Sequence, residues 1–481
     1  MTFTQSITNI AYTSNNAISN KSSLSACLDL FSMGVSASDK HSLIKAALLE
    51  DLPLAVKTVM YLRDPRNSGQ GNRDIARAFH SVVQSLLVDS AFKTAYIELL
   101  PHLPEMGSWK DLYELYDTAD SDVKATILQI VTKALQAEDR LAFKWFPRQS
   151  RLHHDIADLW GQPVGFIRKY VAHHSRTVEQ FMCHKFWDRI DYSSIPSRAN
   201  LIYSKAFLRN DSERRQQFLA DAIAGKVKAN SSVLYPHEVL KQVWEDADTA
   251  EALWKNLPSY SSNINILPVI DVSASMDTTA YSKYSCMDIA MGLGMYFAEH
   301  NTGTYRDLYC TFASKPTFNY LTGSSLYQRA YNLREADWGG STNLQAVFDN
   351  LLQHSLKYPF SDLPKAVIII SDMEFDEASS SQTNFEAIDA KYKVAGLERP
   401  TLIFWRVDVK LNQQPVTFDD NGTILINGYS PAIMKTILSL DMDELANITP
   451  MNLFLKAVNV DKYSFVDTIF KDKIWNTCME Y

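Results

Sequence analysis

The sequence predicts a multidomain protein in which an all-α helical-repeat domain precedes a doubly wound, Rossmann-like α/β domain. From about Leu24 to Leu257, apolar residues recur three and four positions apart, a pattern that buries one face of a helix. After Ser262, short apolar runs alternate with helical segments, which is typical of a mainly parallel sheet covered by helices on both faces. The length of 481 residues is enough for at least two such cores.

We place the domain bounds where the period of the apolar pattern changes. The helical domain is expected over residues 24–260 and the α/β domain over residues 261–458. Residues 1–23 are polar and are expected to form a flexible segment, and residues 459–481 are expected to add a C-terminal helix. Turn signals in the helical domain permit helical-hairpin repeats of the HEAT kind, although no repeated motif is present.

Five apolar runs are the expected strands of the α/β domain, and the segments between most of them carry a helical pattern. The strands are Ile266 to Ile270, Leu308 to Phe312, Ala366 to Ile370, Thr401 to Trp405 and Thr423 to Ile426. The helices are Cys286 to Glu299, Asn343 to His354, Asn384 to Ala395 and Pro431 to Ser439. Pro268 lacks an N–H donor, which leaves the start of the first strand open.

Composition excludes several classes of protein. No apolar run approaches the roughly 20 residues that a bilayer requires, and the N-terminus lacks the basic start and apolar centre of a secretion signal. The five cysteines are scattered and never spaced as C-x-x-C, which argues against a disulfide framework and a zinc knuckle. We therefore expect an intracellular, cytoplasmic protein.

Charge is unevenly distributed along the chain. Residues 1–260 contain 30 Lys and Arg against 29 Asp and Glu, whereas residues 261–481 contain 17 against 26. The first part therefore carries a net charge of +1 and the second a net charge of −9. This difference indicates that the two parts have different partners.

Three segments at the expected strand ends carry oxygen-bearing side chains. The first strand runs into Asp271-Val272-Ser273-Ala274-Ser275, where alternate residues turn one carboxylate and two hydroxyls toward a common point. Thr342 follows the paired glycines of the segment 338–343, and Asp372 ends the strand that begins at Ala366. Loops at the carboxyl ends of parallel strands gather ligands, and oxygen ligands suit Mg²⁺, or Ca²⁺ or Mn²⁺, rather than a soft metal.

Together these segments resemble the metal-ion-dependent adhesion site (MIDAS) of von Willebrand factor A (vWA) domains, which combines D-x-S-x-S with a later Thr and a later Asp. By that resemblance the metal ligands are Asp271, Ser273, Ser275, Thr342 and Asp372, the last acting through water. Ala274 stands where the family often has glycine. The alternative is that Asp271 and Ser273 only close a turn or cap a helix.

Three further carboxylates lie close in sequence to this expected site. Asp277, Glu374 and Asp376 are candidates for its second shell, where they would orient the ligands. The alternative is that they are exposed loop carboxylates, which is the common situation for such residues.

The helical domain contains a basic region between Arg140 and Lys228, with 16 Lys and Arg against 8 Asp and Glu and with interleaved aromatic residues. Positive charge attracts phosphates and aromatic faces stack on unpaired bases, so the region predicts RNA or single-stranded DNA binding. The alternative is that the aromatic residues fill helix–helix cores and the basic residues form solvated faces. The candidate RNA-binding residues are Lys144, Arg148, Arg168, Lys169, Arg176, Lys185 and Arg209.

The order of the two domains resembles the TROVE plus vWA arrangement of the Ro ribonucleoprotein autoantigens, which bind structured and misfolded RNAs. A closer resemblance is to the DUF2828 family, a TROVE-like group without an established activity that is found in plants, fungi, bacteria and large DNA viruses. If this chain is viral, its compartment is the cytoplasm of the host. The matching segments are 61–66 with 69–73, 107–111, 144–148, 190–192 with 196–197, 337–343 and 428–431.

Three functional hypotheses remain open. The first is a non-enzymatic binding or scaffold protein, whose metal site captures an acidic protein or carboxylate ligand and whose helical domain binds structured or single-stranded RNA. The second is a structural or assembly protein whose metal site joins subunits or an acidic protein partner. The third is a metal-dependent phosphoesterase that uses Asp271, Asp372 and Glu374, which is disfavoured because one cation is expected and no general base is evident.

Overall fold

The computed structural model describes residues 8–65, 69–86, 90–147, 149–175, 177–260, 264–312, 315–336, 341–358, 363–378, 381–408 and 412–470. The chain forms two compact units. The sheet unit comprises Met1–Asp39 and Tyr192–Ala457, and the helical unit comprises Lys40–Asp191 and Val458–Tyr481. Among the described residues, none of the helices combines the length and the apolar character that crossing a membrane requires.

The core of the sheet unit is a six-stranded sheet with the strand order β10-β9-β8-β3-β6-β7. All neighbouring strands run parallel except β7, which pairs antiparallel with β6 at the edge. The five strands expected from the sequence are confirmed to within one residue at either end, whereas β7 was not expected. The strands are β3 (Ile266–Ile270), β6 (Leu308–Thr311), β7 (Phe318–Tyr320), β8 (Ala366–Ser371), β9 (Thr401–Arg406) and β10 (Thr423–Asn427).

Pro268 lies inside β3 without interrupting it. All five residues of β3 pair with β8, but β6 pairs only with Val269 and Ile270. Because pairing with β6 begins after Pro268, the missing N–H donor is tolerated in a strand that has neighbours on both sides.

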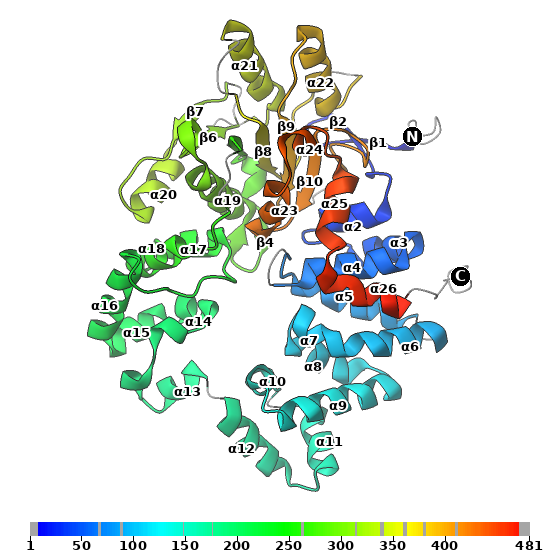
Figure 1. Cartoon of the computed structure of the whole chain (residues 1–481), viewed down its shortest axis with the longest axis vertical. Helices are drawn as coiled ribbons and strands as arrows, with labels where there is room; N and C mark the ends of the chain where they lie inside the picture. The colour runs from blue at the N-terminus through cyan, green and yellow to red at the C-terminus, as the bar shows by residue number, and fades with distance from the viewer. Residues whose placement is uncertain are drawn as a thin grey trace. The chain divides into compact units, whose positions relative to one another are not determined.

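Helices cover both faces of the sheet, as the apolar strands require. On one face, α21 (Leu344–Lys357) and α22 (Asn384–Ala395) pack against each other and share a buried cluster with alternate strand residues such as Val269 and Ile369 (Figure 1). On the other face, α19 (Cys286–His300) packs against β3, β6 and β8. The α/β arrangement expected from the sequence is therefore present.

The connections that leave β3 and β8 lead in opposite directions along the sheet. After β3 it passes through α19 to β6 on one side, and after β8 it passes through α22 to β9 on the other side. In an open parallel sheet, the crevice outside the carboxyl ends of two such strands is the usual ligand-binding position. Asp271 and Asp372 directly follow β3 and β8 and therefore border this crevice.

Residues 192–260, which we assigned to the helical domain, belong to the sheet unit. Their helices include α14 (Ser197–Ile202), α15 (Ser204–Asn210), α16 (Ser212–Ile223), α17 (Pro236–Gln242) and α18 (Ala247–Lys255). Helix α17 lies against α19 at Gly292, where an added Cβ atom would lie 2.6 Å from the backbone of His237. The helical period in the sequence shows that these segments are helices, but it does not show which elements they pack against.

The N-terminal part of the sheet unit is ordered by hydrogen bonds. We expected a flexible segment over residues 1–23, but β1 (Ile10–Tyr12) and β2 (Ile18–Asn20) form an antiparallel hairpin. The Asn20 N–H donates to the carbonyl of Gln414 at 2.9 Å, and the Thr13 hydroxyl donates to the carbonyl of Phe375 at 2.9 Å. The next helix, α2 (Ala26–Met33), begins at the Ser25 N-cap and packs against β10.

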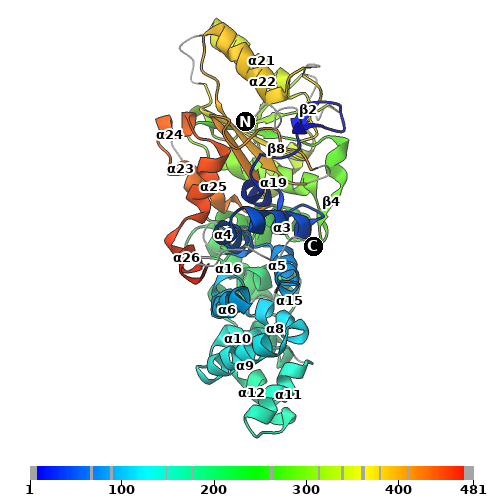
Figure 2. The same cartoon turned by 90° about the vertical axis from the view of Figure 1, so that its right-hand side faces the viewer.

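The helical unit consists of consecutive helices that pack through amphipathic faces. In both Figure 1 and Figure 2, α8 to α12 form one packed group. Helix α26 packs against α4 and α6, so the described end of the chain is tied to this unit. The main helices are α3 (Lys40–Glu50), α4 (Leu52–Arg63), α5 (Arg73–Gln84), α6 (Ser90–Leu99), α8 (Trp109–Thr118), α9 (Ser121–Gln136), α10 (Arg140–Trp145), α11 (Arg151–Leu159), α12 (Val164–Ser175), α13 (Val178–Cys183) and α26 (Ser464–Phe470).

Two of the segments that resemble DUF2828 meet in a buried ion pair of the helical unit. Arg63 donates to both carboxylate oxygens of Asp111, at 2.9 and 3.2 Å. Gly107 makes room for this pair, since an added Cβ atom would lie 2.3 Å from Asp111 Oδ2. These segments therefore hold the helices together through a bidentate contact.

Candidate metal site

The loops that follow β3 and β8 are joined at the crevice. The Asp271 N–H donates to the carbonyl of Ile370 at 3.0 Å, and the Ser371 hydroxyl donates to Asp271 Oδ2 at 2.6 Å. The other carboxylate oxygen of Asp271 accepts the Ser273 N–H at 3.0 Å. Asp271 and Asp372 are both fully buried, so the two expected carboxylates end neighbouring strands inside the protein.

The two expected serine ligands lie together in the loop after β3. The hydroxyl oxygens of Ser273 and Ser275 are 2.9 Å apart, and one donates to the other. The loop continues as the short 3-10 helix η4 (Ala274–Asp277), whose Met276 side chain is buried. Hydrogen bonds within the D-x-S-x-S segment therefore hold Ser273 next to both the Asp271 carboxylate and the Ser275 hydroxyl.

Thr342 reaches the loop after β8 from a different part of the chain. Its buried hydroxyl donates to the carbonyl of Glu374 at 3.2 Å, and its own carbonyl accepts the Asp376 N–H at 3.2 Å. The residues just before it, Asp337 to Gly340, lie outside the described residues. All five expected ligands therefore lie in three loops that are joined by hydrogen bonds to the ends of β3 and β8.

The backbone after Asp372 takes a conformation that is rare for a side chain with a Cβ atom. Met373 has a φ of 68°, and the Glu374 N–H donates to Asp372 Oδ1 at 3.1 Å. The turn places Met373 in the apolar core and buries the carboxylate of Glu374. Backbone conformations of this kind persist only where surrounding contacts hold them, and they are common at functional sites.

Negative charge is concentrated at the crevice. Burial raises the pKa of Asp271 to about 6, and the nearby charge of Asp372 adds to this effect. Arg406 ends β9, pairs with Ser371 of β8 and is also buried. Burial lowers the pKa of Arg406 to about 10, and the negative charges of Glu374 and then of Asp372 oppose this lowering. The buried carboxylates Asp271, Asp372 and Glu374 therefore exceed this guanidinium by two negative charges.

The residues at the crevice fit a hard divalent cation. Their donors are carboxylate and hydroxyl oxygens, which Mg²⁺, Ca²⁺ and Mn²⁺ prefer, and a charge of +2 would balance the excess. Glu374 Oε1 is buried without a hydrogen-bond partner among the described residues. Within the same residues, no three His, Cys, Asp or Glu side chains are grouped so as to hold a metal ion, so a cation here depends on the hydroxyls as well.

The three carboxylates that we expected beside the ligands differ in their surroundings. Glu374 is buried at the site, in contrast to the exposed position that is usual for loop carboxylates. Asp376 is half-buried, and its Oδ1 accepts from the Asn15 amide at 3.3 Å. Asp277 is exposed at the end of η4. The structure therefore brings two of the three to the loops that carry the ligands.

Three residues at the site were missed by sequence reasoning. Ser371 precedes an expected ligand and Arg406 ends the next expected strand, so their places at the carboxyl ends of strands were a usable signal. Asn15 contacts Thr342 across 327 positions of sequence, and no sequence pattern links the two.

The candidate RNA-binding residues are divided between the two units. Lys144, Arg168, Lys169 and Lys185 belong to the helical unit, where all but the half-buried Lys144 are exposed. Arg209 is exposed on α15 of the sheet unit. Arg148 and Arg176 lie outside the described residues.

The aromatic residues of the basic region serve in part as core. Phe143 and Phe146 are buried, whereas Trp145 is 37% exposed. The Lys110 and Lys144 ammonium groups lie 4.1 and 5.1 Å from the centre of the Trp145 ring. Trp145 therefore combines an exposed aromatic surface with two nearby cations.

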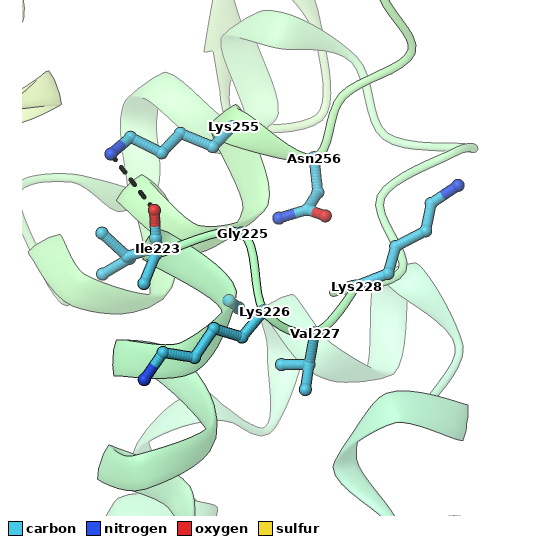
Figure 3. Close-up of a pocket in the computed structure, with 9 residues that line it drawn as sticks. Ile223, Gly225, Lys226, Val227, Lys228, Lys255 and Asn256 are labelled. Carbon is cyan, nitrogen blue, oxygen red and sulfur yellow. Dashed lines mark hydrogen bonds between the residues drawn. The ribbon is translucent and has the colours of Figure 1, made fainter.

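Figure 3 shows a hollow in the sheet unit that is lined by Lys226, Lys228 and Lys255. The carboxyl ends of α16 and α18 border it, and Lys255 donates to the carbonyl of Ile223 at 3.4 Å. Lys226 pairs with Asp221 at 3.1 Å. Because helix carboxyl ends carry negative partial charge, two of these lysines compensate local charge and the hollow is a poor anion site.

Two family models match parts of the chain. Residues 164–266 match a domain of unknown function, DUF2828, which confirms the resemblance inferred from the sequence. Residues 265–462 match a second domain of unknown function, DUF7788, which includes all five expected metal ligands.

A relative and a solved structure are each similar to this chain over most of its length. The uncharacterized protein L728 of Acanthamoeba polyphaga mimivirus is 25% identical over 511 residues, covering 93% of this chain and 87% of the relative. The crystal structure of the Ro (RSR) protein of Deinococcus radiodurans is similar with a TM-score of 0.41 and 13% identity, over 91% of this chain and 99% of that chain.

Proposed function

We propose that this chain is a metal-dependent binding protein with a vWA-like site, in which Asp271, Ser273, Ser275, Thr342 and Asp372 hold one Mg²⁺, Asp372 through water. A cation so held supplies an open coordination position to a carboxylate of an acidic protein partner. The observation that supports the proposal is that the three loops carrying these oxygen donors are joined by hydrogen bonds to the ends of β3 and β8, beside the buried carboxylates of Asp271 and Asp372. Charge balance and ligand type both favour a hard divalent cation.

Direct binding of Mn²⁺ to the full-length protein tests the metal site. We expect one site by isothermal titration and by electron paramagnetic resonance, and we expect Asp271→Ala to abolish it. Asp277→Ala is the matched control, because Asp277 is exposed six residues later in the same loop. Equal Mn²⁺ binding by the wild type and Asp271→Ala would remove the basis of the proposal.

The carboxylate step is tested separately with a simple anion. Sodium acetate should displace a water from protein-bound Mn²⁺ and lower the proton relaxation rate, whereas sodium chloride at the same ionic strength should not. Mn²⁺ that binds but responds equally to both salts would show a structural metal site. A salt-independent, EDTA-sensitive oligomer would instead favour the assembly hypothesis.

We also propose that the helical unit binds RNA, because Trp145 keeps an exposed ring beside two lysines and Phe186 is 41% exposed with Arg189 4.6 Å from its ring centre. Phosphate contacts should make affinity fall steeply with salt. In a filter-binding assay with single-stranded RNA, Lys144→Glu should weaken retention more than Lys133→Glu, a matched charge reversal at an exposed lysine on α9. No retention at low salt would contradict this second proposal.

A further inference from the structure

The turn of the N-terminal hairpin lies against the loop that follows β8. The turn is closed by the Thr13 N–H, which donates to the carbonyl of Ala17 at 2.9 Å, and Asn16 takes a φ of 63°. The Thr13 hydroxyl fixes the turn to the carbonyl of Phe375 at 2.9 Å. Two residues of the turn, Ser14 and Asn15, then face the candidate metal site.

Among the described residues, the hydrogen bonds that Asn15 and Ser14 donate go to residues of that site. The Asn15 amide lies 2.8 Å from the carbonyl of Glu374, 3.3 Å from Asp376 Oδ1 and 3.4 Å from Thr342 Oγ1. The Ser14 N–H lies 2.5 Å from Glu374 Oε2. The turn therefore contacts an expected ligand and both of the buried or half-buried carboxylates beside it.

These contacts restrict the Thr342 hydroxyl. Its proton is directed to the carbonyl of Glu374, and the Asn15 amide approaches its oxygen from the hairpin. The same amide bonds the carbonyl of Glu374, so one side chain ties the Thr342 loop to the β8 loop. A hydroxyl with its donor direction fixed presents its remaining lone pair in one orientation.

We propose that Asn15 is a positioning residue of the metal site and that the N-terminal hairpin is part of that site. This inference rests on the proposed metal-binding function. Asn15 orients Thr342 and the β8 loop without binding the cation itself. Partners of this kind change metal affinity by about 10- to 100-fold when they are removed.

The test compares two asparagines of the same hairpin in the full-length protein. Asn15→Ala should weaken Mn²⁺ binding by about tenfold or more and change the Mn²⁺ resonance spectrum, because the ligand geometry is altered. Asn20→Ala is the matched control, since the Asn20 amide donates to the carbonyl of Gln414, which is neither one of the expected ligands nor one of the carboxylates beside them. It should bind Mn²⁺ as the wild type does. Asn15→Ser, which keeps a common turn residue but is too short to reach the β8 loop, should behave as Asn15→Ala does.

Three outcomes are distinguishable. Wild-type affinity and spectrum in both Asn15 variants would overturn the role of Asn15. Equal weakening by Asn15→Ala and Asn20→Ala would also overturn it, because the hairpin would then act only as a structural support. Unchanged Mn²⁺ binding by Asp271→Ala would instead refute the proposed function, whatever the Asn15 variants show.

Discussion

The imidazole of His237 should make the stability of the sheet unit depend on pH. His237 lies on α17, fully buried, with Nε2 2.6 Å from the Tyr281 hydroxyl and its ring stacked at 5.5 Å on Tyr235. Burial lowers the pKa of His237 from 6.5 to about 3, and the charges of Arg198 and Lys241 act in the same direction. Its Nδ1 has no hydrogen-bond partner among the described residues, so a second proton would find no acceptor there.

The sign and size follow from the pKa difference. Between pH 6.5 and about 3 the unfolded chain binds a proton at this histidine and the folded chain does not, so stability falls as the pH falls. At pH 5 the imidazole is 1.5 pH units below its unfolded pKa, which reduces the free energy of unfolding by about 2 kcal/mol relative to pH 7.5. This loss of stability is absent well above pH 6.5, grows as the pH falls below 6.5 and reaches its limit near pH 3.

The charged groups around His237 are already paired. Arg198 lies 3.1 Å from the carboxylate of Glu238, and Lys241 lies 2.5 Å from that of Asp288. Burial also raises the pKa of Glu238, so its protonation at low pH weakens the pair with Arg198. A variant at His237 itself is therefore needed to isolate the contribution of the imidazole.

Hydrogen exchange of peptides from α17 and α19 reports on the sheet unit alone. This matters because burial also lowers the pKa of His80 in the helical unit, to about 4. Loss of protection between pH 7.5 and 5, corrected for intrinsic exchange, should be smaller in His237→Gln by about 2 kcal/mol. His41→Gln, at an exposed position, should behave as the wild type. The same pH-dependent loss in His237→Gln and the wild type would refute the reasoning.

Three further predictions concern packing and metal. Asp111→Ala leaves Arg63 as an unpaired buried cation and should lower the free energy of unfolding in urea by about 3–5 kcal/mol. Glu114→Ala, which removes exposed pairs with Arg73 and Arg77, should lower it by about 0–1 kcal/mol. Equal losses in the two variants would argue against the buried pair. Gly292→Ala should lower the melting temperature, because the added Cβ atom would meet the backbone of His237. Gly165→Ala is the control, since Gly165 lies in open space on α12 and its substitution should leave the melting temperature unchanged. An unchanged melting temperature in Gly292→Ala would contradict the close contact. Mn²⁺ at 100 times its Kd should stabilise the wild type by about 2.7 kcal/mol in thermal unfolding and leave Asp271→Ala unchanged, and an equal shift in both would place the ion elsewhere.

The strands of the sheet were predictable because they are buried on both faces. Each of β3, β8, β9 and β10 is buried throughout, so each reads in the sequence as a continuous apolar run. Strand β7 escaped because it is a three-residue edge strand with exposed Phe318 and Tyr320, which lacks that signal. The hairpin of residues 10–20 escaped for the same reason: its strands are short and its stability comes from distant partners such as Gln414.

The site was predictable only where topology brings its parts together. Asp271 and Asp372 end neighbouring parallel strands, so their proximity follows from strand order. The hairpin contributes Asn15 through tertiary contacts that strand order does not dictate. The grouping of residues 192–260 with the sheet unit could not be predicted for a similar reason, since the apolar period identifies a helix but not the elements against which it packs.

The surroundings of Glu374 bear on the choice between binding and hydrolysis. A general base needs a carboxylate that is free to approach a water and accept its proton. Glu374 is instead buried, with Oε2 held by the Ser14 N–H, and its charge opposes the lowering of the pKa of Arg406 by burial. In the site that we propose, Arg406 compensates the charge of Glu374, so Asp271 and Asp372 would balance the divalent cation and leave a coordination position for an external carboxylate. A buried carboxylate with one oxygen held by the backbone is a poor general base, so the surroundings of Glu374 favour capture of a ligand over its hydrolysis.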